Sequence, residues 1–208
     1  MKHQHLAAIL VVVFATFGAA SGARADDALF LPVEDSFVIA GMGVVATGTV
    51  VRGTIHTGDQ VELVGTGDPT PAVVRDLQVN FSSVAEAGAG TEVSVILGRV
   101  EQDQVQRGRV IGAPGVLKAH AKITADVTLL AAGGRARPAD DGYRPLLKIW
   151  TQSVPGTFDL GGGQIDLGAT GRVSITLEEA TVAQPGDRFD VTDGGRSVGG
   201  GVVVATQD

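Results

Sequence analysis

Thr57-Gly58-Asp59-Gln60-Val61-Glu62-Leu63 and Pro185-Gly186-Asp187-Arg188-Phe189-Asp190-Val191 repeat one pattern, in which a Gly-Asp pair precedes alternating apolar and polar residues. Glycine supplies the positive φ of a turn and aspartate bonds the backbone beside it, so each pair indicates the start of a strand. In the first copy, Val61 and Leu63 fall on one face of that strand. The repeat predicts two β domains of similar design.

Segments with the composition of strands occur throughout the chain. They are rich in Val, Ile, Leu and Thr, and they lie at residues 44–51, 60–64, 91–97, 122–130, 146–150, 173–177 and 198–206. Short strands with frequent turns are typical of sandwiches and barrels, so we expect an all-β protein. We expect at most a helical turn at residues 84–87 and at residues 101–106.

The boundary between the domains is expected at Ala113-Pro114-Gly115-Val116-Leu117. Pro and Gly interrupt one strand ladder there, before residues 118–122 begin another. We therefore assign residues 26–114 to the first domain and residues 115–208 to the second.

Residues 1–25 have the pattern of a secretory signal. They contain no Asp or Glu, carry Lys2, and continue through an apolar stretch at 6–15 to small residues ending in Ala23-Arg24-Ala25. This pattern predicts cleavage before Asp26. The apolar stretch is shorter than the roughly 20 residues of a membrane span, which makes an uncleaved anchor the less favoured alternative. We therefore expect a periplasmic or secreted protein.

The charge of the chain limits its partners. The sequence has 16 basic and 23 acidic residues, a net charge of -7, and removal of the leader takes away two basic residues and no acid, which leaves -9. A nucleic-acid backbone needs cations that replace its counterions, and an acidic surface repels it, so nonspecific nucleic-acid binding is not expected. The sequence has no Cys, which excludes disulfides and thiolate metal sites.

Eight motifs, in their order and spacing, resemble the second and third domains of the elongation factor Tu family. In the first domain they are Leu31-Pro32-Val33-Glu34-Asp35-Ser36-Phe37, Gly41-Met42-Gly43-Val44-Val45-Ala46-Thr47-Gly48, Val51-Arg52-Gly53 and Gln106-Arg107-Gly108-Arg109-Val110. In the second they are Gly133-Gly134-Arg135, Gly142-Tyr143-Arg144-Pro145, Pro185-Gly186-Asp187 and Gly194-Gly195-Arg196-Ser197-Val198-Gly199-Gly200-Gly201. The resemblance implies two consecutive β-barrels of about six strands each, with a leader where the family's GTPase domain would stand.

In that family the first barrel holds the aminoacylated end of a tRNA, and the second contacts its stem. By position, the resemblance places Glu34, Asp35, Phe37 and Thr47 in the family's ligand pocket. An acid can accept hydrogen bonds from ribose hydroxyls, and a Phe ring can stack on a base. A second interpretation stays open, in which Phe37 alternates with its apolar neighbours and packs in the core, while the two acids are solvated turn residues.

Several departures from the family weigh against tRNA. Gly41-Met42-Gly43 stands where the family usually has Gly-Arg-Gly. Ser82-Ser83 follow Phe81 where the family tends to place basic residues, and Glu92 takes the place of an Asn. Residues 135–141 replace a His-Thr-Pro-Phe run. Each change replaces a nucleic-acid or domain contact by something neutral or acidic.

The sequence carries no pattern for GTP binding. A phosphate-cradling loop needs G-x-x-x-x-G-K-[ST], and none of Lys2, Lys118, Lys122 and Lys148 follows a Gly. The only Asn, Asn80, is not followed by the Lys of the guanine-reading Asn-Lys-x-Asp motif. We expect no GTPase activity and no cofactor.

Gly195-Arg196-Ser197-Val198-Gly199 satisfies G-x-S-x-G, the nucleophile elbow of many hydrolases, in which a strained turn joins a strand to a helix. The following residues, 200–205, have the composition of a strand, so we expect no catalytic residue. His56 and His120 lie in different predicted domains and outside any H-x-x-H or H-E-x-x-H pattern, so no metal site is expected either.

Arg144 and Arg196 allow two interpretations. Ion pairing with the many acids of the chain is one. A contact with another protein is the other, and it includes Tyr143, whose side chain has an apolar body and a polar tip. The resemblance is consistent with the second, because in the family these barrels meet the GTPase domain and the exchange factor.

Two functional hypotheses follow. The favoured one is an exported, noncatalytic binding module that binds a protein or another cell-envelope ligand. The alternative is a translation elongation factor-like protein that stays in the cytosol and retains aminoacyl-tRNA binding. The leader and the acidic charge favour the first.

Overall fold

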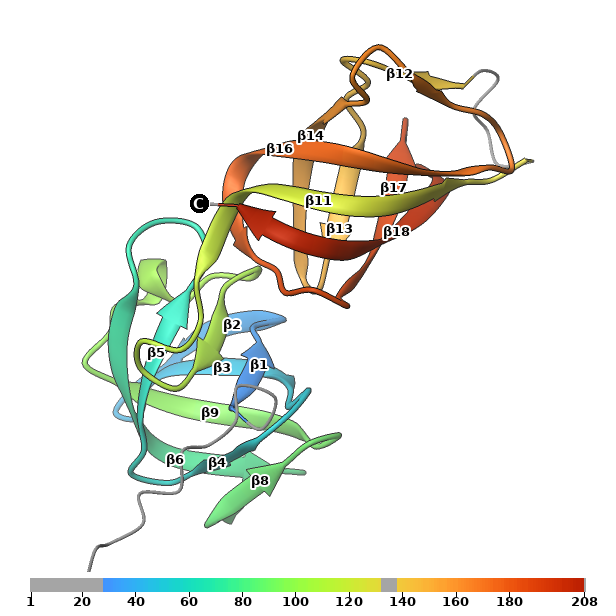
Figure 1. Cartoon of the computed structure of the whole chain (residues 1–208). Coiled ribbons are helices and arrows are strands. Elements are labelled where there is room, and N and C mark those ends of the chain that lie inside the picture. The colour runs from blue at the N-terminus through green and yellow to red at the C-terminus, as the bar shows by residue number, and fades with distance from the viewer. Residues whose placement is uncertain (1–27, 132–137, 208) are drawn as a thin grey trace, which may run out of the picture.

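The structure, a computed structural model, describes residues 28–131 and 138–207. These residues form two β domains, the first below the second in Figure 1, joined by residues 113–118. The all-β prediction is confirmed. The predicted leader and the motif at residues 133–135 lie outside the described residues.

The first domain is a curled sheet. Its strands are β1 (Phe30–Pro32), β2 (Asp35–Ile39), β3 (Gly43–Thr49), β5 (Gln60–Val64), β6 (Thr70–Val79), β7 (Ser82–Val84), β9 (Glu92–Gly98) and β10 (Val110–Gly112). They follow the order β1-β10-β5-β6-β9-β3-β2, with β7 paired to β6. Two more strands, β4 (Thr54–His56) and β8 (Glu86–Gly88), form a separate ribbon. The sheet curls far enough that the Phe30 amide donates to the Arg52 carbonyl at 3.0 Å.

The second domain is a closed barrel with the order β11-β16-β14-β13-β17-β18. Its strands are β11 (Ala119–Leu129), β13 (Leu146–Ile149), β14 (Gln152–Asp159), β16 (Thr170–Val182), β17 (Arg188–Asp193) and β18 (Arg196–Gln207). A short ribbon of β12 (Ala139–Asp140) and β15 (Gln164–Ile165) lies at one end. The expected six-stranded barrel therefore describes the second domain. The main sheet of the first domain has eight strands, and β1 and β2 stand at opposite ends of its ladder.

Only one of the two expected helical turns forms. Residues 101–106 contain a short 3-10 helix, η2 (Gln102–Gln104), as predicted. The prediction for residues 84–87 is wrong, because β7 folds back on β6 across the two-residue turn Asn80-Phe81 and β8 pairs with β4. Within the part of the chain that the structure describes, no helix has the length and apolarity to span a membrane.

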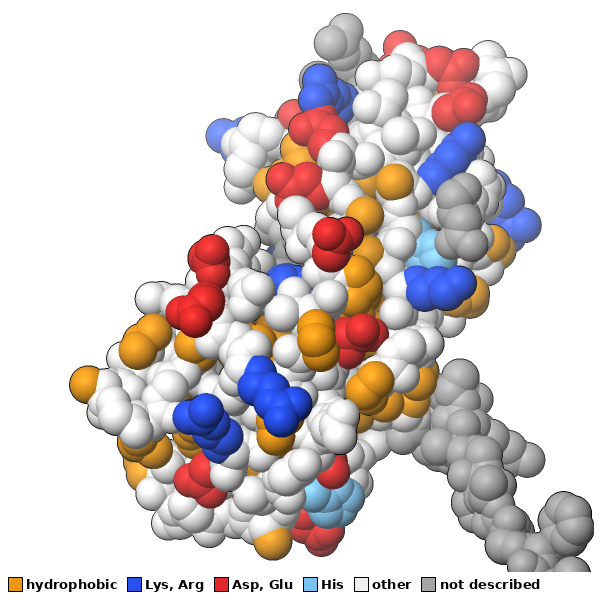
Figure 2. All heavy atoms as spheres, turned by 90° about the vertical axis from the view of Figure 1, so that its left-hand side faces the viewer, with side chains coloured by type: hydrophobic (Ala, Val, Ile, Leu, Met, Phe, Trp, Pro, Cys, Tyr) orange, Lys and Arg blue, Asp and Glu red, His pale blue; other side chains and the backbone are white. Residues whose placement is uncertain are grey.

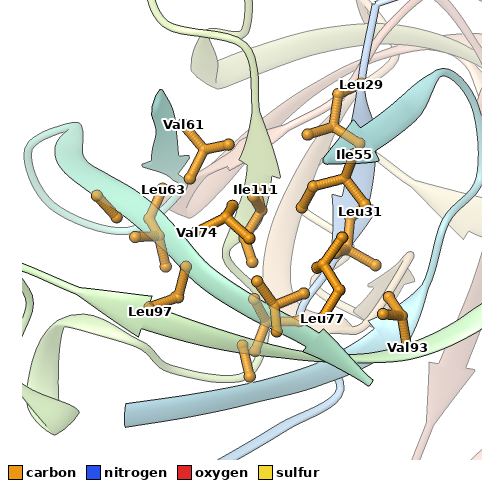
Figure 3. Packing of buried hydrophobic residues seen from close by; sticks show 14 of the residues in the cluster. Leu29, Leu31, Ile55, Val61, Leu63, Val74, Leu77, Val93, Leu97 and Ile111 are labelled. Carbon is orange, nitrogen blue, oxygen red and sulfur yellow. The ribbon is translucent and has the colours of Figure 1, made fainter. Parts of the chain in front are cut away.

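The core of the first domain forms on the inner face of the curled sheet. Figure 3 shows Val61 and Leu63 of β5 pointing toward apolar side chains of β6, β9 and β10. Both residues are buried, as their alternation predicts. Each buried aliphatic side chain of this kind contributes about 1.5–3 kcal/mol relative to an exposed one, so the alternation of these strands fixes which face turns inward.

A small apolar cluster joins the two domains. Phe30, Val64, Val110 and Leu117 pack there with Val182 of the second barrel, and Trp150 lies against them. The Arg52 guanidinium stands 4.4 Å from the centre of the Phe30 ring and donates to the Gln184 side chain of the second domain. A cation over an aromatic face is attracted to it, so Arg52 strengthens the same contact.

A buried arginine ties the loop after β5 to the sheet. Arg109 donates to the carbonyl oxygens of Leu63 (2.6 Å), Asp68 (2.7 Å) and Gln104 (2.9 Å), and to the Thr70 hydroxyl (3.2 Å). Burial lowers the pKa of Arg109 from its ordinary value. A buried charge needs such hydrogen bonds, so Arg109 has a structural role.

Candidate binding site

Three of the four positions carried over from the family come together where β2 pairs with β3. Asp35 stands opposite Thr47 in the ladder, and the Thr47 hydroxyl donates to the Asp35 carbonyl at 3.5 Å. The Glu34 amide donates to the Thr47 carbonyl at 2.8 Å, and the Glu34 carboxylate accepts from the Thr49 hydroxyl at 3.4 Å. The side chains of both acids are exposed, so they are available to a ligand.

Phe37, the fourth position, does not pack in the core. It lies in β2, the last strand of the sheet, and 41% of the residue is exposed. Alternation alone suggested a buried position, but burial also needs a layer that covers the strand, and no residue of β2 is buried. The Phe37 ring therefore presents apolar surface to solvent.

A cavity of about 140 Å³ lies on the outer face of the sheet. It is lined by Thr47, Gln78, Asn80, Phe81, Glu92, Val93 and Ser94, and we call it the Thr47 cavity. Val93 and Val95 pack in the core, so the alternation of β9 turns Glu92 and Ser94 outward. Hydroxyl, amide and carboxylate groups thus converge on a space smaller than the 300–1,000 Å³ typical of pockets for small-molecule ligands.

Phe81 is the most unusual residue of this cavity. It is 99% exposed, and its φ of 62° follows a φ of 51° at Asn80. A turn with two positive φ values suits Asn and Gly, whereas a bulky side chain there is strained. From the sequence, Phe81 was named only to locate the departure at Ser82-Ser83. Its position in a two-residue turn between strands was the signal available.

A second hollow, of about 730 Å³, lies beside β2. It is lined by Ser36, Glu101, Gln102, Asp103, Val105, Gln106 and Arg107, and we call it the β2 groove. The Ser36 hydroxyl donates to the Val105 carbonyl and so holds one end of β2 to the η2 segment. Arg107 is turned to backbone carbonyls, donating to those of Glu34 and Thr151 at 3.3 Å.

The side of the molecule in Figure 2 mixes exposed apolar and charged groups. Hydrophobic side chains lie on the surface of the first domain, in the lower half of the view, and acidic side chains appear on both domains. The net charge of the whole chain is -7.

The three positions proposed for a protein contact lie in the second domain. Arg144 forms an ion pair with Glu178, which matches the ion-pairing interpretation for that residue. The Tyr143 hydroxyl donates to Asp193 at 3.1 Å, and its ring packs edge-on against Phe158. Arg196 stands opposite Asp193 in the β17–β18 ladder, and its side chain is exposed.

Ser197 does not occupy a nucleophile elbow. It lies inside β18, paired with Thr192, and the β17–β18 ladder continues on both sides of it. The strand-to-helix turn that such a nucleophile needs is replaced by a hairpin.

His56 contacts two acidic side chains. His56 Nδ1 lies 3.3 Å from Asp59 and Nε2 lies 3.2 Å from Glu86. Across the residues that the structure describes, no group of three or more His, Asp or Glu side chains is arranged to hold a metal ion.

The architecture defines a class of proteins in which a curled β domain precedes a closed six-stranded barrel. Comparison with protein-family models identifies both parts: elongation factor Tu domain 2 matches residues 43–112, and the elongation factor Tu C-terminal domain matches residues 116–207. The chain belongs to the elongation factor Tu family. Thr47 lies inside the first matched range, and Glu34, Asp35 and Phe37 precede it.

Proposed function

We propose that this chain is an exported, noncatalytic binding module that recognises a protein or another cell-envelope ligand, without GTPase activity. The observation that carries the proposal is Phe81, a fully exposed aromatic residue in a strained turn at the rim of a polar cavity. Strained backbone and exposed aromatic residues both concentrate at binding sites. Neither feature stabilises the folded chain by itself.

The size of the Thr47 cavity supports a protein ligand. A volume of about 140 Å³ suits a single side chain better than a whole nucleoside. Glu92 at its wall repels phosphate and attracts a cation. A partner side chain with a polar or basic end would fill this cavity while the Phe81 ring covers its apolar stem.

The cellular location can be tested by fractionation of cells that express the full chain with its own leader. We expect the protein in the envelope or the medium, with Asp26 as its first residue. Full-length protein confined to the cytosol would overturn the export part of the proposal.

The binding role can be tested with envelope extract and immobilised protein. We expect a retained envelope component that is lost in Phe81→Ser and kept in Val202→Ser, an exposed apolar position on the second barrel. Equal retention by both variants, or no retention by the unchanged protein, would contradict the role proposed for Phe81.

Aminoacyl-tRNA remains the second candidate ligand, favoured by one observation: Thr47 lines the cavity and Asp35 and Glu34 lie beside it. Titration of the protein with aminoacyl-tRNA and with uncharged tRNA tests it. Binding that prefers the aminoacylated form would support this candidate; the envelope proposal predicts none in the micromolar range.

A further inference from the structure

The outer edge of β2 is an unprotected strand edge. In the ladders of the described residues, β2 pairs with β3 alone, with an uninterrupted register from Asp35 opposite Thr47 to Ile39 opposite Gly43. Natural edges are usually blunted by a Lys, a Pro or a bulge, and β2 has none of these. The Ser36 side chain is held by Val105, which leaves residues 37–39 as the open part of the edge. The Ile39 carbonyl accepts from the Met42 amide, so the backbone groups of Phe37 and Ile39 face β3 and those of Val38 face outward.

The open part of the edge is also apolar on both sides. Phe37, Val38 and Ile39 are 41%, 54% and 38% exposed, and Met42 in the following turn is 37% exposed. Successive side chains of a strand point to opposite faces, so apolar surface flanks this edge above and below. An extended peptide that added to the edge would bury these side chains together with its own.

The charges around the edge select the occupant. Glu34 and Asp35 precede the apolar residues, and Glu101 and Asp103 line the β2 groove alongside. Arg107 is the one cation among the groove residues, and it donates to carbonyl oxygens. A second copy of this chain carries the same net charge of -7, which opposes the association of two copies at this edge.

From this geometry we infer that β2 takes up an extended, apolar segment of a partner protein by strand addition, with Lys or Arg residues of that segment lying in the β2 groove. The inference rests on the proposed function, because it names the binding mode and the chemistry of the partner. Backbone hydrogen bonds to the outward-facing N–H and C=O of Val38 and burial of the apolar side chains of residues 37–39 supply affinity, and the groove acids select a basic end.

The probe is a blocked nine-residue peptide with alternating Val and Thr and two Lys at one end. Titration into the ¹⁵N-labelled chain is expected to shift the amide signals of residues 37–39 and to slow the hydrogen exchange of the outward-facing Val38 amide. A matched peptide with Glu in place of Lys should bind at least about tenfold more weakly, because it meets like charges. The lysine peptide should also weaken as salt increases.

Val38→Lys tests the site, and Val202→Lys is its control, because it makes the same change at an exposed position of the second barrel. We expect at least about tenfold weaker binding for the first variant and no change for the second, with equal melting temperatures. Binding without slowed exchange at the Val38 amide, equal affinity of the two peptides, absence of binding, or a dimer formed through β2 would each overturn the inference. Retention of an envelope component that depends on Phe81 would still support the binding module itself.

Discussion

Phe30 of the first domain packs against Trp150 of the second, with ring centroids 5.0 Å apart and ring planes tilted by 53°. Phe30 is fully buried, although it belongs to a strand of only three residues at the end of a sheet. Strand β1 therefore contributes to two apolar clusters. Phe30 packs in the cluster between the domains, and the next residue, Leu31, packs in the core of the first domain.

Phe30→Ala is expected to reduce the free energy of unfolding by about 3–5 kcal/mol, because it removes a buried ring and leaves a cavity between the domains. Trp150, the only Trp, reports the contact by fluorescence. When the Phe30→Ala variant is unfolded in urea, we expect the transition followed by Trp150 fluorescence to separate from the transition followed by circular dichroism. Phe37→Ala, at an exposed ring, should cost about 0.5 kcal/mol or less. Equal effects of the two substitutions would contradict the shared core.

Arg109→Met is expected to destabilise the chain by about 2–4 kcal/mol, because it leaves three carbonyl groups and the Thr70 hydroxyl without their donor. Chemical denaturation measures the loss. Arg107→Met serves as the control, since Arg107 is exposed and donates at longer distances. A loss for Arg109→Met no larger than the control's would show that the buried cation is dispensable.

Gly48→Ala should destabilise the first domain, because a Cβ at this position would lie 2.2 Å from the Pro32 carbonyl oxygen. Backbone cannot move aside as a flexible side chain does, so we expect a cost of about 1–3 kcal/mol. Gly88→Ala is the matched control, with the nearest atom at 3.9 Å. Thermal melting should separate the two variants, and a stable Gly48→Ala would show that β1 and β3 are less closely packed than described.

Phe81→Gly is expected to leave the stability unchanged or to raise it by up to about 1 kcal/mol. Glycine accepts the positive φ without strain, although it gains more freedom in the unfolded chain. Partner binding should fall at the same time. A melting temperature lowered by more than a few degrees would mean that Phe81 stabilises the fold, which its exposure argues against.

The Asp126–Arg172 pair predicts a pH dependence. Arg172 donates to the Asp126 carboxylate at 2.8 and 2.9 Å. These hydrogen bonds lower the pKa of Asp126 from its ordinary value, and the positive charge of Arg172 lowers it further. Desolvation of the carboxyl group acts in the opposite direction. A carboxyl group with a lower pKa in the folded state stabilises the protein above its unfolded pKa of about 3.9, and this contribution disappears as pH falls through the folded pKa.

The pKa of Arg172 is raised by the same hydrogen bonds, so it stays charged throughout that range. An NMR titration of the Asp126 carboxyl measures the effect. We expect its pKa below about 3.9 in the unchanged protein and a return toward that value in Arg172→Gln. The same pKa in both proteins would refute the pairing.

Much of the fold could be predicted from the sequence, because alternation and Gly-Asp turns mark strands such as β5 directly. Residues 70–79 and 152–159 were missed because Pro71, Pro155 and Gly156 interrupt their pattern. Pro71 lies near the start of its strand, and a Cβ at Gly156 would come within 2.8 Å of the Leu147 and Ile175 side chains. Whether a strand accepts a Pro or a Gly depends on its neighbours in the folded structure, and a local sequence pattern gives no information about these.

The candidate site could be predicted only in part. The resemblance brought Glu34, Asp35 and Thr47 to one place in the structure, since ladder pairing follows from the hairpin between them. The exposure of Phe37 depends on β2 being an edge strand, and the role of Phe81 depends on the turn that holds it. The exposure of Phe37 arises from sheet order, which the spacing of residues in one sequence does not give. The turn at Phe81 is local, but its positive φ values follow from the pairing of β6 with β7.

The most direct test of the proposed function is photo-crosslinking from position 81 in intact cells. Phe81 is replaced by a photoreactive phenylalanine derivative in the full chain, where its exposure leaves room for the added group. We predict a covalent adduct with a polypeptide, found in the envelope fraction and attached to a chain that begins at Asp26. An adduct with tRNA on uncleaved cytosolic protein, or no adduct at all, would contradict the account.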